Sequence, residues 1–128
     1  MFNVELDKTR DKAFILANSA SHTTSEIRYL AATDPKGQFK VVQPRENLHE
    51  YYVDHHGGLF YIRTNKGAKN YRIVTTPVAN PNIENWKELV AHRADVKHED
   101  ADFFVNHMVI YERTGGLPKL RVTNLKSK

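Results

Sequence analysis

Serine side chains could supply the nucleophile of acyl transfer, but none of the four serines in this sequence has the setting that this chemistry requires. A catalytic serine commonly lies on a tight turn between small residues, as in the pattern G-x-S-x-G. None of Ser19, Ser21, Ser25 and Ser127 has a glycine two positions away on either side. The first three lie in one polar segment, residues 18–25, where hydroxyl groups commonly bond the backbone of a turn. We therefore expect no catalytic serine in this chain.

Histidines could hold a metal ion, and the pair His55-His56, with His49 and His107 elsewhere, is the arrangement that most suggests it. Successive side chains on a β-strand point to opposite faces, so the adjacent pair would share one ion only if the turn at Gly57-Gly58 rotated one ring. Neither His-Glu pair of the chain continues as H-E-x-x-H, and the chain has no cysteine. The alternative is a corner between two strands, in which an Asp and a His bond the backbone. We expect this structural role, and neither a metal nor another cofactor.

Three carboxylates, Glu99, Asp100 and Asp102, are close enough in sequence to form the pair of acids that general acid–base catalysis uses. Such a mechanism needs two of them to face one cleft. They follow an expected strand at 96–99 and precede Phe103-Phe104, which is the pattern of a solvated hairpin tip. We expect that role, and we assign no catalytic, cofactor-binding or metal-binding residue to the chain.

The distribution of basic and aromatic side chains argues against a nucleic-acid partner. The net charge is +4, but the lysines and arginines are scattered along the chain among acids and form no continuous stripe. Adjacent aromatic pairs at 51–52, 60–61 and 103–104 could be stacking platforms, yet a strand sends one ring of each pair to each face. Core packing explains these pairs better.

Length and composition are those of one modest domain. The chain has 128 residues, of which 40% are hydrophobic and 27% charged, close to the average of folded proteins. No apolar run approaches the roughly 20 residues of a membrane span, and the acidic N-terminal residues do not resemble a signal peptide. We expect a soluble, cytoplasmic protein with no membrane partner.

Short runs of β-branched and aromatic residues, bounded by turn residues, predict an all-β fold. Glycine-containing turns are expected at 34–37, 57–58, 65–67 and 115–116. An exposed loop is expected at 77–85, with at most a short helical turn near 83–86. The expected strands are 13–17, 26–30, 39–42, 51–54, 59–64, 71–76, 86–90, 96–99, 107–113 and 119–125.

A weak internal repeat favours a β-propeller. The segment LFYIRTNKGAKNYRIV (59–74) matches MVIYERTGGLPKLRVT (108–123) at a shift of 49 residues, and residues 71–74 match 27–30 at a shift of 44. Repeats of about 40–50 residues with four short strands are typical of propeller blades. We predict a partial propeller of about two and a half four-stranded antiparallel blades, at 1–44, 45–92 and, incomplete, 93–128. The alternative is one antiparallel sandwich or barrel.

The same alternation predicts which side chains face the cores between adjacent sheets. These residues share an apolar side chain at a repeated inward position of a strand. They are Phe14, Leu16, Tyr61, Tyr71, Ile73, Ile110, Leu120 and Val122.

Four segments together resemble the oligopeptidase B (protease II) branch of the prolyl oligopeptidase family of serine peptidases. They are HTTSEIRYL (22–30), FKVVQPRENLHEYYVDHHGGLFYIRTNKGAKNYRIVTTPV (39–78), NWKELVAHRADV (85–96) and ERTGGLPKLRV (112–122). The resemblance implies the middle of that family's N-terminal propeller. The serine, aspartate and histidine triad of its C-terminal α/β-hydrolase domain has no counterpart here, so no catalytic residue is carried over.

The resemblance implies a function for the whole parent protein, with two hypotheses for this chain. In the first, the chain is a non-catalytic propeller segment of a peptidase that hydrolyses short peptides after Lys or Arg, and the propeller restricts substrate access. Its partners would be the hydrolase domain and the remaining blades. In the second, it is a free-standing β-rich module that binds a peptide or protein on a strand edge. Because a blade would not begin at Met1, we expect a piece of a longer propeller that self-associates through its open blades.

Overall fold

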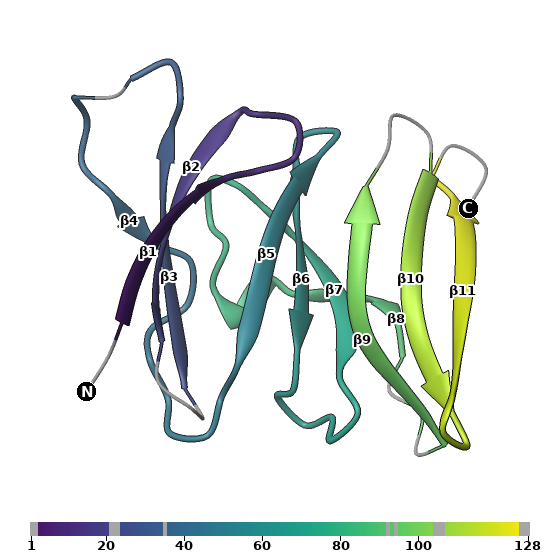
Figure 1. Cartoon of the computed structure of the whole chain (residues 1–128). Helices are drawn as coiled ribbons and strands as arrows, with labels where there is room; N and C mark the ends of the chain where they lie inside the picture. The colour runs from purple at the N-terminus through teal and green to yellow at the C-terminus, as the bar shows by residue number, and fades with distance from the viewer. Residues whose placement is uncertain are drawn as a thin grey trace.

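A computed structural model describes residues 3–20, 24–34, 36–91, 93, 95–103 and 107–125, with the side chains of Asn3 and Phe103 excepted. These residues form three antiparallel sheets in succession along the chain (Figure 1). Within each sheet, every strand pairs with the strand that follows it in sequence. No α-helix occurs in the described ranges. No helical segment of these ranges is long and apolar enough to cross a membrane.

The first sheet has the order β1-β2-β3-β4 and the second the order β5-β6-β7-β8. The strands of the first are β1 (Asn3–Lys8), β2 (Phe14–Ala20), β3 (Ser25–Ala31) and β4 (Lys40–Val41). The strands of the second are β5 (Tyr51–His56), β6 (Leu59–Thr64), β7 (Arg72–Pro77) and β8 (Lys87–Val90), with a 3₁₀ turn, η1 (Ile83–Asn85), before β8. This turn lies in the loop where the sequence predicts one.

The third sheet contains three described strands in the order β11-β10-β9. They are β9 (Val96–Phe103), β10 (His107–Thr114) and β11 (Leu117–Asn124). Two-residue turns join β5 to β6 and β10 to β11. Their glycines, Gly57-Gly58 and Gly115-Gly116, all have positive φ, which glycine adopts without a steric cost.

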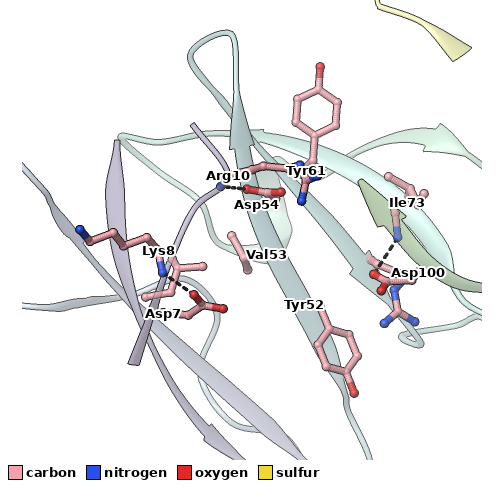
Figure 2. Close-up of a pocket in the computed structure, with 12 residues that line it drawn as sticks. Asp7, Lys8, Arg10, Tyr52, Val53, Asp54, Tyr61, Ile73 and Asp100 are labelled. Carbon is pink, nitrogen blue, oxygen red and sulfur yellow. Dashed lines mark hydrogen bonds between the residues drawn. The ribbon is translucent and has the colours of Figure 1, made fainter. Parts of the chain in front are cut away.

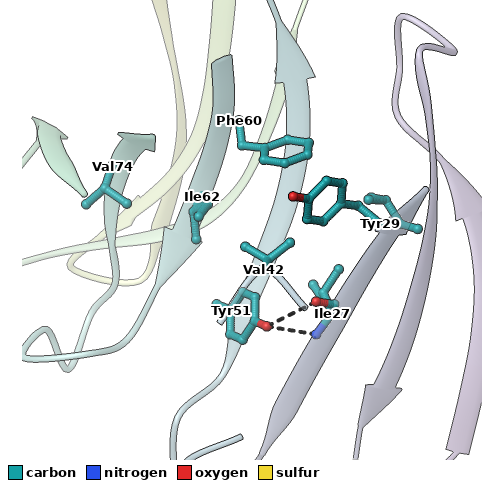
Figure 3. Close-up of a cluster of buried hydrophobic side chains, with 8 residues drawn as sticks. Ile27, Tyr29, Val42, Tyr51, Phe60, Ile62 and Val74 are labelled. Atoms are coloured by element: carbon teal, nitrogen blue, oxygen red, sulfur yellow. Dashed lines mark hydrogen bonds between the residues drawn. The ribbon is translucent and has the colours of Figure 1, made fainter. Parts of the chain in front are cut away.

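Two apolar clusters bind neighbouring sheets together. The first lies between sheets one and two and joins Leu16, Ile27, Tyr29 and Val42 to Tyr51, Phe60, Ile62 and Val74 (Figure 3). The second lies between sheets two and three and joins Tyr61 and Ile73 to Met108, Ile110 and Leu125. The middle sheet therefore buries both faces, as Phe60 and Tyr61 show by pointing into different clusters.

The arrangement confirms the all-β prediction. It rules out a single sandwich, because three sheets follow one another and the second packs against both of its neighbours. The sequence analysis missed β1, whose residues alternate apolar and acidic side chains. The blade limits 1–44, 45–92 and 93–128 stay a prediction.

Two of the predicted core residues are wrong. Leu120 and Val122 are 67% and 63% exposed, whereas Ile73 is buried. Leu120 and Val122 lie on the face of the third sheet that is turned away from the second sheet, where no fourth sheet follows among the described residues. The other predicted core residues are buried or half-buried.

Candidate functional site

The first strands of the three sheets converge on one cavity of about 330 Å³ (Figure 2). β1 contributes Asp7 and Lys8, β5 contributes Tyr52 and Asp54, and β9 contributes Asp100. Arg10 and Arg63 complete its charged lining, so the cavity carries both signs of charge. Neither serine nor histidine occurs among the described residues that line it.

The three carboxylates of this cavity are each oriented by the backbone. Asp54 Oδ1 accepts the amides of Arg10 at 2.8 Å and His55 at 2.9 Å, and partial burial raises the pKa of Asp54. Asp7 and Asp100 each accept the amide of the next residue at 2.8 Å. Bonds of this kind hold a carboxylate against its own strand, so the lining is built as a scaffold of fixed charges.

Arg63 is held by two rings, that of Tyr52 on β5 and that of Tyr71 directly before β7. Its guanidinium carbon lies 4.4 Å from the centre of the Tyr52 ring and 4.9 Å from that of Tyr71. Arg63 also donates to the main-chain oxygen of His98 at 3.2 Å, which links sheets two and three. Burial, together with the neighbouring carboxylate of Glu50, raises the pKa of Tyr71 to about 12.

The serines considered from the sequence have structural roles where they are described. Ser19 Oγ accepts a hydrogen bond from Arg45 at 2.8 Å, and Ser25 is buried at the start of β3. The Ser25 amide donates to the oxygen of His49 at 2.9 Å. Ser21 and Ser127 lie outside the described residues.

The histidine pair divides between two faces, as the strand period predicts. The ring of His55 pairs through Nδ1 with Asp11 and lies 4.8 Å from the ring of Phe14, on the side of the first sheet. The ring of His56 lies 6.1 Å from that of Tyr61, which belongs to the other cluster. Asp54 bonds the backbone at this corner as predicted, but His55 binds a carboxylate instead.

The other two candidate histidines, His49 and His107, lie in different surroundings. His49 is buried with Nε2 2.7 Å from Thr64 Oγ1, and His107 is exposed. In the part of the chain that the structure describes, no three His, Asp or Glu side chains are placed to hold one ion.

The prediction of a hairpin tip at the acidic cluster is wrong. Glu99, Asp100 and Asp102 lie inside the eight-residue strand β9. Glu99 Oε1 lies 3.0 Å from Arg113 Nε on β10. This cross-strand pair offsets the negative charge of Glu99, which alone would disfavour a strand. Asp102 accepts a bond from the Tyr111 hydroxyl at 2.8 Å.

Sequence reasoning also missed a buried ionic group in the third sheet. His98 is fully buried, and its Nδ1 lies 3.1 Å from Glu112 Oε2, which in turn lies 3.4 Å from Arg121. Burial lowers the pKa of His98. The sequence does contain one indication of this group. Glu112 continues the alternating inward positions of β10 that Met108 and Ile110 occupy, so an acid stands where an apolar side chain is expected.

Comparison with known proteins decides what this scaffold is. The model of the prolyl oligopeptidase N-terminal β-propeller domain matches residues 1–128. The chain belongs to this family. The predicted partial propeller and the family resemblance are therefore confirmed.

Relatives with known names are much longer than this chain. Dipeptidyl aminopeptidase BI of Pseudoxanthomonas mexicana is 41% identical over 122 residues, 94% of this chain and 17% of that protein. The prolyl endopeptidase-like protein of Gallus gallus is 30% identical over 122 residues, again 94% of this chain and 17% of that protein. The chain thus spans less than a fifth of the relatives that it matches.

Solved structures show the same arrangement of sheets. Oligopeptidase B from Leishmania major aligns with a TM-score of 0.87 at 29% identity, over 96% of this chain and 18% of that one. Oligopeptidase B from Trypanosoma brucei with covalently bound antipain aligns with a TM-score of 0.86 at 27% identity, over 97% of this chain and 18% of that one.

Proposed function

We propose that this chain is a non-catalytic propeller segment of a serine peptidase similar to oligopeptidase B, which hydrolyses short peptides after Lys or Arg. The family match over residues 1–128 carries the proposal, and the two oligopeptidase B structures that align over nearly the whole chain support the choice of branch. Catalysis then belongs to an α/β-hydrolase domain of the longer protein. That domain and the remaining blades are the partners of this segment.

The role of the segment in this proposal is to restrict substrate access. Support comes from the convergence of β1, β5 and β9 on a cavity of about 330 Å³, which is the size of a site for a small ligand. In this proposal, the cavity along the first strands admits an extended peptide and excludes a folded protein. Because the composition is that of a folded protein without cysteine, we also propose a cytoplasmic location.

A second candidate is removal of dipeptides from a free N-terminus. The observation in its favour is the 41% identity to a protein named dipeptidyl aminopeptidase BI, higher than the identity to either oligopeptidase B. The free-standing binding module of the sequence analysis is the non-enzymatic alternative.

The test is an assay of the longer protein that contains these residues, with this chain alone as the control. We expect cleavage of a blocked chromogenic arginyl substrate, and weak cleavage of long polypeptides. Faster hydrolysis of unblocked dipeptidyl substrates would favour the second candidate. The chain alone should show the background rate, and a serine in it labelled by a fluorophosphonate would contradict the proposal. A reading frame that stops here, followed by an unrelated gene, would favour the binding module.

We further propose that the isolated chain self-associates through its outer sheet faces. Support comes from apolar side chains at both ends of the row of sheets, where exposure is 71% for Leu6 and 67% for Leu120. In a complete propeller, neighbouring blades cover such faces.

A further inference from the structure

The turn between β1 and β2, residues 9–13, is internally rigid. The buried Thr9 donates its amide to Phe14 at 2.9 Å and receives that of Lys12 at 2.8 Å. Asp11 Oδ1 accepts the Thr9 hydroxyl at 2.7 Å and the Ala13 amide at 3.1 Å. Lys12 has a φ of 63°, in the left-handed region. These bonds fix two directions, one for the Arg10 amide together with Asp11 Oδ2 and one for the Arg10 guanidinium.

One of those directions leads to the second sheet. The Arg10 amide donates to Asp54 Oδ1 at 2.8 Å, and Asp11 Oδ2 pairs with His55 Nδ1. Asp54 and His55 are consecutive residues of β5. The turn therefore holds the first strand of the second sheet through both a main-chain and a side-chain contact.

The other direction leads to the third sheet. The Arg10 guanidinium lies 3.3 Å from Asp102 Oδ1 on β9, and Asp102 Oδ2 accepts the Tyr111 hydroxyl of β10 at 2.8 Å. Arg10 has two partners, Asp54 and Asp102, which are far apart in sequence and belong to different sheets. A single turn of the first sheet thus contacts all three.

The turn also borders the cavity at the first strands. Arg10 and Asp54 both line the cavity, and Figure 2 shows their bond beside the side chain of Val53. Ala101 of β9 lines the same cavity and is half-buried. Movement of the turn away from β5 and β9 would therefore widen the opening of the cavity.

We propose that residues 9–13 form a clasp that ties the first strands of three consecutive sheets together and closes one side of the cavity between them. Arg10 is the residue on which the clasp depends, because it alone in the turn contacts both the second and the third sheet among the interactions described above. The proposal does not depend on any hydrolase domain, and this chain is sufficient to test it.

The first experiment measures access to the cavity. Because the chain has no cysteine, Ala101→Cys introduces a single thiol, whose rate of reaction with an aromatic disulfide reagent reports access. Adding Arg10→Gln should raise this rate about two- to fivefold, the range expected from loss of an exposed ion pair. The matched control is Arg93→Gln, which removes an exposed pair of the same 3.3 Å length to Asp95 within one segment. An unchanged rate with Arg10→Gln, or an equal rise with Arg93→Gln, overturns the proposal.

The second experiment separates opening of the clasp from unfolding of the turn. In Asp102→Asn, hydrogen exchange of the Arg10 amide should accelerate about two- to fivefold. The amides of Thr9 and Lys12, which bond within the turn, should keep their rates. Unchanged exchange at Arg10, or equal acceleration of all three amides, overturns the proposal. Tyr111→Phe, which removes only the hydroxyl that supports Asp102, should have a smaller effect in the same direction.

Discussion

Tyr51 shows how one buried polar atom can join two sheets. Its hydroxyl accepts the Ile27 amide of β3 at 2.8 Å (Figure 3). The same hydroxyl donates to the Gln43 main-chain oxygen at 2.7 Å. Burial raises the pKa of Tyr51 to about 12. The hydroxyl is neutral at any physiological pH, and it satisfies one main-chain group of the neighbouring sheet and one of the segment that follows β4.

Tyr51→Phe should therefore lower the free energy of unfolding by about 1–3 kcal/mol, because it leaves buried main-chain groups of Ile27 and Gln43 without a partner. Urea unfolding followed by circular dichroism measures this change. Tyr52→Phe is the matched control. The Tyr52 ring is 39% exposed and its stacking on Arg63 survives the change, so the loss should stay within about 0.5 kcal/mol. Equal losses would show that the Tyr51 hydroxyl is not the link.

His98 makes stability depend on pH. Burial lowers its pKa in the folded chain below the ordinary value of 6.5, and burial lowers that of His49 in the same way. As pH falls through 6.5, the unfolded chain takes up protons that the folded chain does not. Stability should thus decrease between about pH 7.5 and about pH 5.5, by up to about 1.4 kcal/mol per pH unit for each histidine.

Urea unfolding at several pH values measures this slope. Since His98→Gln removes the titrating ring, the variant should show a flatter dependence on pH, whatever its absolute stability. A slope identical to that of the unchanged chain would contradict the role of His98.

At the scale of elements, register decides which side chains are buried. The 49-residue repeat places Ile110 over Tyr61, yet Tyr61 faces the third sheet and Ile110 faces the second. A shift of one residue moves a side chain to the opposite face of its sheet. The repeat therefore identifies corresponding strands but not corresponding faces.

A pair of truncations tests these faces. Ile110→Ala should cost about 2–5 kcal/mol, because Ile110 is completely buried between sheets two and three. At a protein concentration at which the chain is monomeric, Leu120→Ala on the neighbouring strand should change stability by less than about 0.5 kcal/mol, because Leu120 faces solvent in the single chain. Thermal or urea unfolding of both variants provides the comparison, and similar losses would mean that the outer face of β11 is covered.

At the scale of the whole molecule, we expect the two ends of the row of sheets to decide whether chains associate. Large apolar side chains are exposed on both end sheets, among them Val4, Leu6, Leu120 and Val122. Covering apolar surface gains roughly 25 cal/mol per Å², so pairing of these faces is favourable.

Light scattering across a concentration series should give masses that rise above the 14.8 kDa of one chain. The double variant Leu120→Lys with Val122→Lys should shift the distribution toward the monomer, because it places two charges on one end face. A single monomeric species at every concentration would rule out association through these faces.

Local sequence patterns are sufficient to predict most of the strands, the glycine turns and the family. β6 was predicted with its observed limits, and the Gly57-Gly58 and Gly115-Gly116 turns were placed correctly. These features depend on neighbours in the chain, because alternation and a positive φ are local properties. The absence of the G-x-S-x-G pattern is also visible in sequence alone.

Only the tertiary structure decided which faces are covered and which distant charges meet. The sequence predicts a solvated hairpin tip at Glu99, Asp100 and Asp102. In the structure these acids lie in β9, and pairing with β10 places Arg113 beside Glu99. Leu120 and Val122 match the pattern of core residues, but burial requires a neighbouring sheet as well as a pattern. Arg10 binds partners on β5 and β9 that are far from it in sequence. Such contacts depend on how sheets pack side by side, and strand periodicity carries no information about that packing.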